Sequence, residues 1–247
     1  MCIGVSGDGD SASIGLGQFA HVVRRRTNML YLVDNTGTYG LTKGQFSATN
    51  DKGSTSKKGA PNLYEPIDLV SMALQLGASF VARSFSGDKR QLVPLIKAAL
   101  KHKGMAFIDV ISPCVAFNNH AGSTKSFEFV REHMQSAVQA DLIFGQPEIT
   151  ADYAQGTRES VTMPDGSILQ LYKVDADYDP YDRIGALTYV QKMHEEGQVA
   201  TGLLYVDPDA VECLDILETT ATPLSALSED ALCPGSEALA AINQSYK

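Results

Sequence analysis

The sequence has few cysteines, an excess of acidic over basic residues, and no long hydrophobic run. Its four cysteines are too few and too widely spaced for a disulfide framework. Lysine and arginine total 20 against 29 aspartates and glutamates, and the net charge of −9 disfavours a nucleic-acid-binding or anionic-membrane-binding surface. No apolar run approaches the roughly 20 residues of a transmembrane helix, and no signal peptide is recognisable. We therefore expect a cytoplasmic protein that contacts neither nucleic acid nor membrane.

What the sequence does contain is enough hydrophobic material for one large domain or two small ones. It has 247 residues, of which 44% are hydrophobic. The chain begins abruptly, because the apolar segment Cys2–Ser6 runs at once into the polar turn Gly7–Asp10. Natural domains seldom begin on a core strand whose turn carries chemistry, so we expect that a preceding segment is missing.

The first half of the chain alternates between apolar strands and amphipathic helices. Strands are predicted at residues 2–6, 29–33, 79–84 and 106–111, and helices at 14–26, 66–76 and 88–103. Ser11 or Ser13 is predicted to cap the first helix and Asp88 the third. Continuously apolar strands separated by helices favour an α/β fold with a parallel sheet covered on both faces. The polar stretch 42–62 is too long to be a plain connector.

The second half has a weaker pattern. Helices are predicted at 126–132 and 182–197, strands at 141–144 and 201–206, and a hairpin at 161–168 around Pro164-Asp165-Gly166. The chain beyond Asp207 is acidic and is broken by prolines. We therefore predict an α/β domain over residues 1–122, followed by a mixed C-terminal extension over residues 123–247.

Polar groups follow two of the predicted strands in matching positions, as Gly7–Asp10 and Asn35–Thr38. Glycines and a helix N-terminus suit a phosphate, and ligands of open parallel sheets bind at the carboxyl ends of the strands. A carboxylate at Asp8 fits there if a divalent cation lies between it and the phosphate. Mg²⁺ takes about six oxygen ligands, and Asp8, the Thr36 hydroxyl and the Thr38 carbonyl could supply three. By itself a Gly-Asp-Gly sequence is more often an ordinary turn.

The spacing from Gly-Asp-Gly through a helix and a strand to a polar loop is similar to the diphosphate-binding motif of thiamine diphosphate enzymes. Three further segments, YGLTKGQFSAT (39–49), SPCVAFN (112–118) and HAGSTK (120–125), resemble the β subunit of 2-oxoacid:ferredoxin oxidoreductases. The resemblance extends over nearly the whole chain and is closest to the form that acts on 2-oxoglutarate. It implies the thiamine diphosphate-binding fold, of which this chain would supply the diphosphate-binding domain.

The resemblance also implies a set of site residues. Cofactor binding falls to Gly7, Asp8, Gly9, Asp10, Thr36, Thr38 and Tyr39, with Asp8, Thr36 and Thr38 as Mg²⁺ ligands. The family has a second asparagine where this chain has Thr36, whose hydroxyl can still bind the metal. Lys43 is implied to meet the carboxylate of the 2-oxoacid, and the alternative is a solvated loop lysine.

Cys114 corresponds to one ligand of the family's [4Fe–4S] cluster, which takes four thiolates. The other three family ligands belong to an N-terminal segment that this sequence does not show. Cys2, Cys213 and Cys233 do not have ligand spacing. Without the resemblance, Cys114 is an ordinary small buried residue.

The activity implied is oxidative decarboxylation of a 2-oxoacid to acyl-CoA, with electrons passed to ferredoxin. The partners implied are a separate α subunit, ferredoxin, the 2-oxoacid and CoA. Two alternatives stay open: a thiamine diphosphate-dependent decarboxylase or synthase without redox chemistry, and an inactive truncated remnant.

The remaining charged and histidine residues have plainer interpretations. The basic runs Arg24–Arg26 and Lys57-Lys58 suggest solvated faces, with docking of acidic ferredoxin or the CoA phosphates as a hypothesis. His120 is expected to be structural. Four histidines are predicted to be solvated on polar helix faces: His21, His102, His133 and His194.

Overall fold

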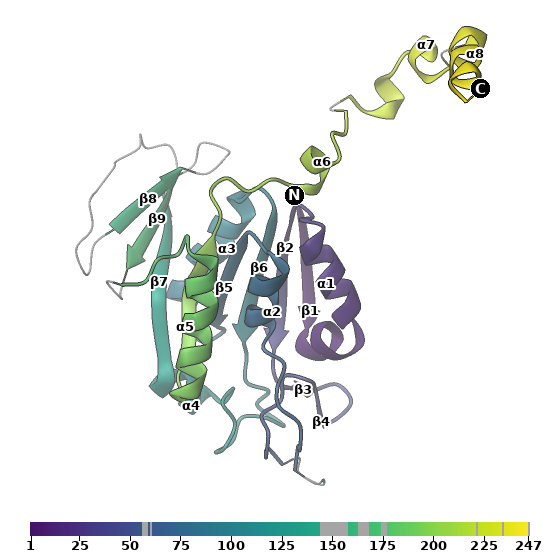
Figure 1. Cartoon of the computed structure of the whole chain (residues 1–247). Helices are drawn as coiled ribbons and strands as arrows, with labels where there is room; N and C mark the ends of the chain where they lie inside the picture. The colour runs from purple at the N-terminus through teal and green to yellow at the C-terminus, as the bar shows by residue number, and fades with distance from the viewer. Residues whose placement is uncertain are drawn as a thin grey trace. The chain divides into compact units, whose positions relative to one another are not determined.

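One large mixed sheet organises the computed structural model of the chain (Figure 1). Its strands are β1 (Cys2–Gly7), β2 (Met29–Asn35), β5 (Phe80–Phe85), β6 (Met105–Ile111), β7 (Met134–Ile143), β8 (Arg158–Thr162), β9 (Ile168–Lys173) and β10 (Val199–Val206). They are hydrogen-bonded in the order β1-β2-β6-β5-β10-β7-β9-β8. A separate two-stranded ribbon pairs β3 (Thr38–Tyr39) with β4 (Gln45–Phe46).

The helices fall between these strands and after them. They are the π-helical turn η1 (Gly9–Ile14), α1 (Leu16–Arg24), α2 (Leu69–Leu76), α3 (Lys89–Lys101), α4 (Phe127–His133), α5 (Arg183–Glu195), α6 (Cys213–Ile216), the 3₁₀ turn η2 (Leu224–Ala226), α7 (Glu229–Leu232) and α8 (Gly235–Ser245). None of the helices in the described part of the chain combines the length and hydrophobicity that crossing a bilayer requires.

The structure describes residues 1–55, 59, 61–143, 158–162, 168–173, 177–220, 222–233 and 235–246. The chain forms two compact units, Met1–Cys213 and Leu214–Lys247. The first contains the whole sheet. In the second, none of the described residues is buried. The functional division at residue 122 stays a prediction.

Four strands, β1, β2, β6 and β5, are mutually parallel, as the sequence predicts. The chain moves one way across the sheet from β1 to β2 to β5 and then returns to β6. Right-handed crossovers therefore place α1 and α2 on one face and α3 on the other. Helix α2 contacts both α1 and α5, whereas α3 contacts β5, β6 and β7. The parallel sheet covered on both faces is confirmed, and the extension adds β7 to β10 as a mixed continuation of the same sheet.

The core lies between this sheet and its helices. Its largest fully buried side chains are Phe80, Phe107, Leu30, Leu69, Leu74, Leu95, Met105, Ile108, Leu203 and Leu204. Phe19 of α1 packs edge-on against Phe107 of β6, with ring centroids 5.2 Å apart. Burying each such side chain contributes about 1.5–3 kcal/mol, so the apolar runs read from the sequence are the ones that hold the sheet and helices together.

One of the two predicted caps is confirmed, because Asp88 accepts hydrogen bonds from backbone N–H groups in the first turn of α3. Ser126 and Asp182, which are not predicted as caps, accept in the same way at the starts of α4 and α5. The prediction for α1 is wrong, because Gly15 precedes it without a side-chain cap and the turn η1 comes first. Ser11 instead bonds Ser6 and the Tyr31 hydroxyl.

Two further predictions meet different outcomes. His102 is wrongly predicted to be solvated: it ends α3 as a buried residue, and its Nε2 lies 2.7 Å from Ser79 Oγ. The predicted hairpin is present as the antiparallel pair β8 and β9, while its turn and Lys57-Lys58 lie outside the described residues.

Strand β1 is one edge of the sheet, with β2 as its hydrogen-bonded neighbour among the described strands. Its Ile3 and Val5 are 59% and 71% exposed. The predicted core strand therefore has an apolar surface that this part of the chain leaves uncovered.

Candidate metal and diphosphate site

Asp8 lies directly after β1 and is almost completely buried. Strands β1 and β2 are parallel, with Gly7 opposite Asp34, so the residues that follow the carboxyl ends of the two strands lie close together. Asp8 Oδ1 accepts a hydrogen bond from Thr36 N at 3.0 Å and lies 3.2 Å from Thr36 Oγ1. Its Oδ2 accepts from the hydroxyl groups of Ser47 and Thr49. Four neutral donors therefore hold one carboxylate in place.

The three oxygens predicted to bind Mg²⁺ are adjacent. Thr36 Oγ1 lies 3.2 Å from Asp8 Oδ1 and 2.8 Å from the Thr38 carbonyl oxygen. Neighbouring ligands of an octahedral Mg²⁺ with bonds near 2.1 Å are about 3 Å apart, which matches both separations. The single Thr36 proton can bridge only one of the two contacts at a time. A hard cation is an ordinary way to hold three such oxygens together, so the donor set fits the group that the family implies.

A second observation at this site is the Thr38 hydroxyl. Thr38 is buried, and its Oγ1 has no hydrogen-bond partner among the described residues. A buried hydroxyl without a partner is destabilising unless a ligand satisfies it. A diphosphate oxygen is a suitable acceptor, and the first N–H groups of a helix such as η1 lack intrahelical acceptors as well.

Tyr39 closes the other side of the Gly-Asp-Gly turn. Its hydroxyl donates to the carbonyl of Gly9 at 3.0 Å. A Cβ at Gly9 would lie 2.3 Å from the Tyr39 ring, so this position requires glycine. Asp10, also predicted to bind the cofactor, is exposed and points its backbone carbonyl at the Gly15 N–H.

Lys43 lies in the loop between β3 and β4, outside the buried cluster. It is exposed and adopts a left-handed backbone conformation with φ 77°. A non-glycine residue in this region is strained, and such strain is concentrated at functional sites. The exposed ammonium is free to meet an anion that arrives from outside.

All four cysteines are free of disulfides; Cys114 and Cys213 are half-buried, whereas Cys2 and Cys233 are exposed. The Cys114 sulfur lies 3.6 Å from the position of a Cβ on Gly40, and the Cys114 carbonyl accepts from Phe117 N and Asn118 N. In the described part of the chain, no group of three or more His, Cys, Asp or Glu residues is placed to hold a metal ion. The described residues therefore do not fit a four-thiolate cluster.

A second buried polar cluster lies beside the first, and we call it the Arg83 cluster: Asn35, Asp68, Arg83 and Asp109. Asn35 Nδ2 donates to Asp109 Oδ1 at 3.0 Å, and Arg83 Nε donates to Asp109 Oδ2 at 2.8 Å. Arg83 Nη2 also pairs with Asp68, which caps α2 through Ser71 N. Thr49 Oγ1 lies 2.9 Å from Asn35 Oδ1 and so connects the two clusters.

Burial and ion pairing act in opposite directions on these carboxyls. Burial raises the pKa of Asp109, and the charge of Arg83 offsets only part of this rise. Burial also opposes ionisation of Asp68, but Arg83 and Ser71 hold its pKa below the ordinary value. Although burial alone would lower it, the pKa of Arg83 is raised further by its two carboxylate partners.

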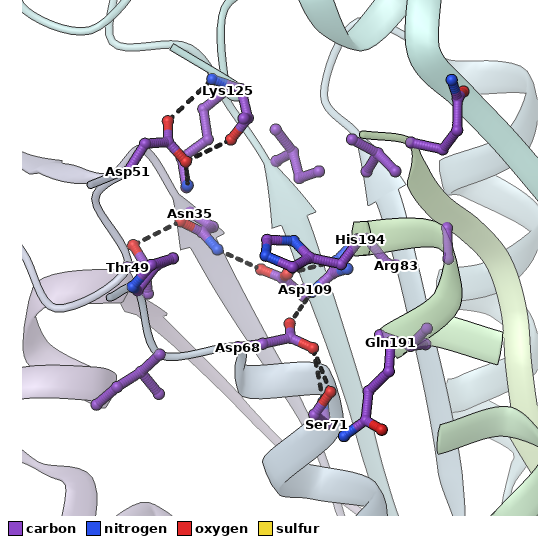
Figure 2. Close-up of a pocket in the computed structure, with 18 of the residues that line it drawn as sticks. Asn35, Thr49, Asp51, Asp68, Ser71, Arg83, Asp109, Lys125, Gln191 and His194 are labelled. Carbon is purple, nitrogen blue, oxygen red and sulfur yellow. Dashed lines mark hydrogen bonds and ion pairs between the residues drawn. The ribbon is translucent and has the colours of Figure 1, made fainter. Parts of the chain in front are cut away.

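The Arg83 cluster lines a cavity of about 760 Å³ between α2, α5 and the sheet (Figure 2). Asp51 and Lys125 form an ion pair at another part of the wall, with 3.3 Å between Nζ and Oδ1. Every buried polar side-chain atom of the lining residues has a partner within the chain.

Sequence reasoning missed Ser47, Thr49, Arg83 and Asp109. Ser47 and Thr49 stand inside the segment 39–49 that carries the resemblance, and only the folded loop shows that they bond Asp8. Arg83 and Asp109 are charged residues within apolar strands. A charge in such a position usually has a buried partner, and that signal could have paired them.

Comparison with known proteins supports the resemblance. Residues 1–110 match the family described as the C-terminal TPP-binding domain of thiamine pyrophosphate enzymes, thiamine pyrophosphate being thiamine diphosphate. The chain is 43% identical over 114 residues to the 2-oxoacid:ferredoxin oxidoreductase subunit beta of Saccharolobus solfataricus. These 114 residues are 46% of this chain and 37% of that protein. It is 39% identical over 116 residues to the 2-oxoglutarate oxidoreductase subunit KorB of Mycobacterium tuberculosis, and the matched segment is 47% of this chain and 31% of that protein.

The chain thus spans well under half the length of these relatives. A solved structure, the 2-oxoglutarate:ferredoxin oxidoreductase from Magnetococcus marinus with 2-oxoglutarate, coenzyme A and succinyl-CoA bound, superimposes with a TM-score of 0.62. The two share 25% sequence identity, and the match covers 89% of this chain and 63% of that one. The predicted fold and the resemblance to oxidoreductase β subunits are confirmed.

Proposed function

We propose that this chain, a relative of 2-oxoacid:ferredoxin oxidoreductase β subunits, binds thiamine diphosphate through Mg²⁺ and works in an oxidoreductase complex that decarboxylates a 2-oxoacid. The arrangement of Asp8, Thr36 and Thr38 carries the proposal, because Thr36 Oγ1 lies 3.2 Å from the Asp8 oxygen and 2.8 Å from the Thr38 oxygen, as neighbouring ligands of one Mg²⁺ would. The favoured substrate is 2-oxoglutarate, which is named for several of the relatives.

In this function the residues of the chain hold the cofactor and do not perform the carbon chemistry. Asp8, Thr36 and the Thr38 carbonyl bind Mg²⁺, and the buried Thr38 hydroxyl donates to the diphosphate. Ser47 and Thr49 fix the Asp8 carboxylate so that its free lone pairs face the metal. Thiamine diphosphate, when bound, supplies the carbanion-stabilising chemistry of decarboxylation. We expect a separate α subunit to complete the site.

Lys43 is proposed to bind the substrate carboxylate from the loop above this site. Its strained φ presents an exposed ammonium at the tip of the ribbon formed by β3 and β4. A point charge on a flexible stem attracts a carboxylate without demanding one fixed geometry. The loop lies beside the metal ligands because Thr38 and Tyr39 are themselves part of β3.

The acceptors of the reaction are also part of the proposal. The 2-oxoacid loses CO₂, its electrons pass to ferredoxin, and CoA takes up the acyl group, in a complex that includes the α subunit. Cys114 stays a proposed cluster ligand by resemblance only, and we derive no step through it because the described residues do not fit a cluster.

The test is to purify the chain under anaerobic conditions together with its α subunit. We expect Mg²⁺-dependent binding of thiamine diphosphate and reduction of viologen that depends on 2-oxoglutarate and CoA. Cofactor binding with decarboxylation but no viologen reduction would favour a non-redox thiamine enzyme. A complex that binds no thiamine diphosphate would overturn the proposal and leave an inactive remnant.

A further inference from the structure

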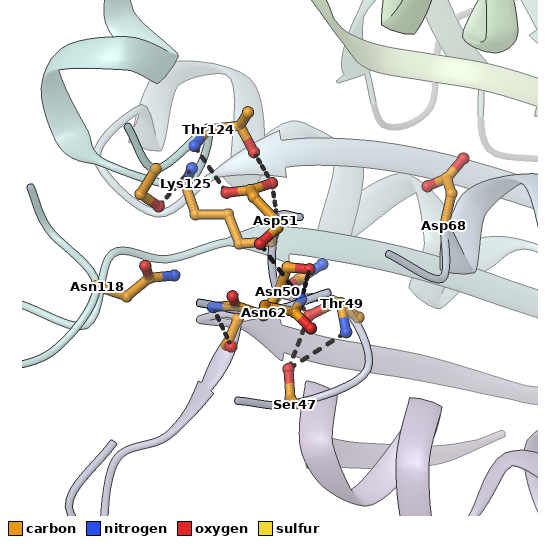
Figure 3. Close-up of polar contacts among 12 residues, drawn as sticks. Ser47, Thr49, Asn50, Asp51, Asn62, Asp68, Asn118, Thr124 and Lys125 are labelled. Atoms are coloured by element: carbon orange, nitrogen blue, oxygen red, sulfur yellow. Dashed lines mark hydrogen bonds and ion pairs between the residues drawn. The ribbon is translucent and has the colours of Figure 1, made fainter. Parts of the chain in front are cut away.

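Two buried asparagines, Asn50 and Asn118, hold the turn that carries the proposed metal ligands; Figure 3 shows their side chains. Asn118 Nδ2 donates to the Thr36 carbonyl at 2.8 Å, and Asn50 Nδ2 donates to the Gly37 carbonyl at 2.9 Å. The two come from different parts of the chain, Asn50 from the loop after β4 and Asn118 from the segment after β6. They therefore tie the turn to two independent parts of the first unit.

The turn has little room to move between them. Gly37 has a left-handed φ of 71°, and a Cβ there would lie 2.6 Å from Asn118 Nδ2 and 3.0 Å from the Lys125 side chain. With the Thr36 and Gly37 carbonyls occupied by the asparagines, the Thr38 carbonyl is the one directed at Thr36 Oγ1. The contacts thus select which carbonyl of the turn faces the metal.

Each asparagine is anchored on its own side. The Asn118 N–H donates to the Cys114 carbonyl at 2.8 Å, and the Asn50 carbonyl accepts from Asn62 Nδ2 at 3.0 Å. Both side chains are 1% exposed, and the Oδ1 of each has no hydrogen-bond partner in the described part of the chain. A buried acceptor without a partner lowers stability. Stability alone does not explain these two buried amides. Their Nδ2 groups donate to the turn, and this is the contact that they provide.

We propose that Asn50 and Asn118 are positioning residues that hold the Thr36–Thr38 turn in its Mg²⁺-binding conformation. The inference rests on the proposed function and adds two residues to it. Mg²⁺ demands near-ideal octahedral geometry, whereas Ca²⁺ accepts longer bonds and irregular ligand sets. Without the Asn50 and Asn118 side-chain donors, the affinity of the turn for Mg²⁺ should therefore fall more than its affinity for Ca²⁺.

The experiment is calorimetric titration of the full chain, in complex with its α subunit, with thiamine diphosphate in the presence of Mg²⁺ or Ca²⁺. Asn118→Ala and Asn50→Ala should each weaken Mg²⁺-dependent binding by about 10- to 100-fold, the range found for residues that orient metal ligands. The loss with Ca²⁺ should be smaller, so the ratio of Mg²⁺ to Ca²⁺ affinity falls. General destabilisation would lower the melting temperature without changing this ratio.

Asn28→Ala is the matched control. Asn28 also has a buried Oδ1 without a partner among the described residues. It lies just before the amino end of β2, however, whereas the Thr36–Thr38 turn follows the carboxyl end of that strand. Its replacement should leave both affinities unchanged. Asn118→Leu keeps the same branched arrangement of non-hydrogen side-chain atoms without the donor, and it decides the question if Asn118→Ala does not fold.

The outcomes separate the two proposals. A wild-type complex that binds thiamine diphosphate with neither ion overturns the proposed function and this inference together. A wild-type complex that binds, with asparagine variants that keep the wild-type Mg²⁺ to Ca²⁺ ratio, overturns the positioning role alone.

Discussion

The molecule contains two adjacent buried polar clusters of opposite design. In the Asp8 cluster (Asp8, Thr36, Ser47 and Thr49), hydroxyl and amide groups surround a single carboxylate, and among the described residues no cationic side chain is bonded to it. In the Arg83 cluster, a guanidinium lies between two carboxylates, and its charge offsets part of theirs within the cluster. Thr49 and Asn35 connect them by one hydrogen-bond contact.

The difference teaches which cluster is built for a ligand. A buried carboxylate held only by neutral donors keeps its charge for an outside cation, whereas a buried ion pair is complete without one. The Asp8 cluster also adjoins a buried hydroxyl without a partner, and the Arg83 cluster has no such atom. We therefore assign ligand binding to the first and structural support to the second.

The largest expected effect tests the structural role of the Arg83 cluster. Arg83→Met leaves the buried Asp109 and the half-buried Asp68 without their cation, so the free energy of unfolding should fall by about 3–5 kcal/mol. Urea denaturation measures this loss. Arg83→Met combined with Asp109→Leu removes the more deeply buried of the two uncompensated carboxylates and should recover part of the stability. A single variant as stable as the wild type would contradict the structural role.

The next prediction separates the acid sensitivity of the Arg83 cluster from that of the buried imidazole of His102, which ends α3 and lies beside Ser79. Burial lowers the pKa of His102 to about 4, below the ordinary value of about 6.5. The unfolded chain then binds more protons between these values, so stability falls as the pH drops from about 6.5 to about 4, by at most about 3 kcal/mol.

His102→Gln should flatten this part of the stability profile, measured by urea denaturation from pH 7 to pH 3.5. The loss that persists near and below pH 4 belongs to carboxylates such as Asp68, whose pKa is lowered in the folded state. An unchanged profile would show that the pKa of His102 is the same in the folded and unfolded chain.

A third prediction tests the ligand role of the Asp8 cluster. Asp8→Asn has the same shape but no charge, and it should weaken Mg²⁺-dependent thiamine diphosphate binding by more than about 100-fold, beyond the range for residues that only orient ligands. Calorimetry on the complex with the α subunit measures this. Asp209→Asn is the control, because Asp209 is an exposed acidic residue that follows β10 and is not among the predicted cofactor-binding residues. Equal binding by both variants would remove Asp8 from the metal site.

The smallest expected effect concerns Lys43, which lies outside both clusters. Lys43→Gly removes the ammonium and relieves the left-handed φ. The KM for the 2-oxoacid should rise about tenfold, the effect of about 1.4 kcal/mol of lost binding, while the melting temperature stays equal or increases. Lys52→Ala, which removes an exposed lysine paired with Glu65, is the control. A change in kcat without a change in KM would remove the carboxylate role.

The sequence predicts the fold well because its signals are local. The apolar run in β6 and the caps Asp88 and Asp182 each depend on neighbours within a few residues. Ser11 shows the limit of such signals, since a partner on β2, the Tyr31 hydroxyl, takes the side chain that could have capped α1. His102 shows the same limit, because its burial comes from packing that no local pattern shows.

The site is predictable only in part for the same reason. Asp8 and Thr36 can be predicted because parallel strands bring their ends together, which spacing alone indicates. Asn50 and Asn118 cannot, because their role depends on which backbone carbonyl each side chain reaches after the loops have folded. Sequence patterns find the ligands of a site more easily than the residues that orient them.

The uncovered edge of β1 has a consequence for how this chain behaves in solution. Strand β1, which bears the exposed Ile3 and Val5, pairs with β2 on one side only in the described part of the chain, so another strand can add on its other side. Pairing of two such edges involves two copies of the chain, so the rate of self-association should increase with the square of the protein concentration. Dilute refolding, or expression beside a partner that occupies this edge, is therefore the practical route to material for every measurement described above.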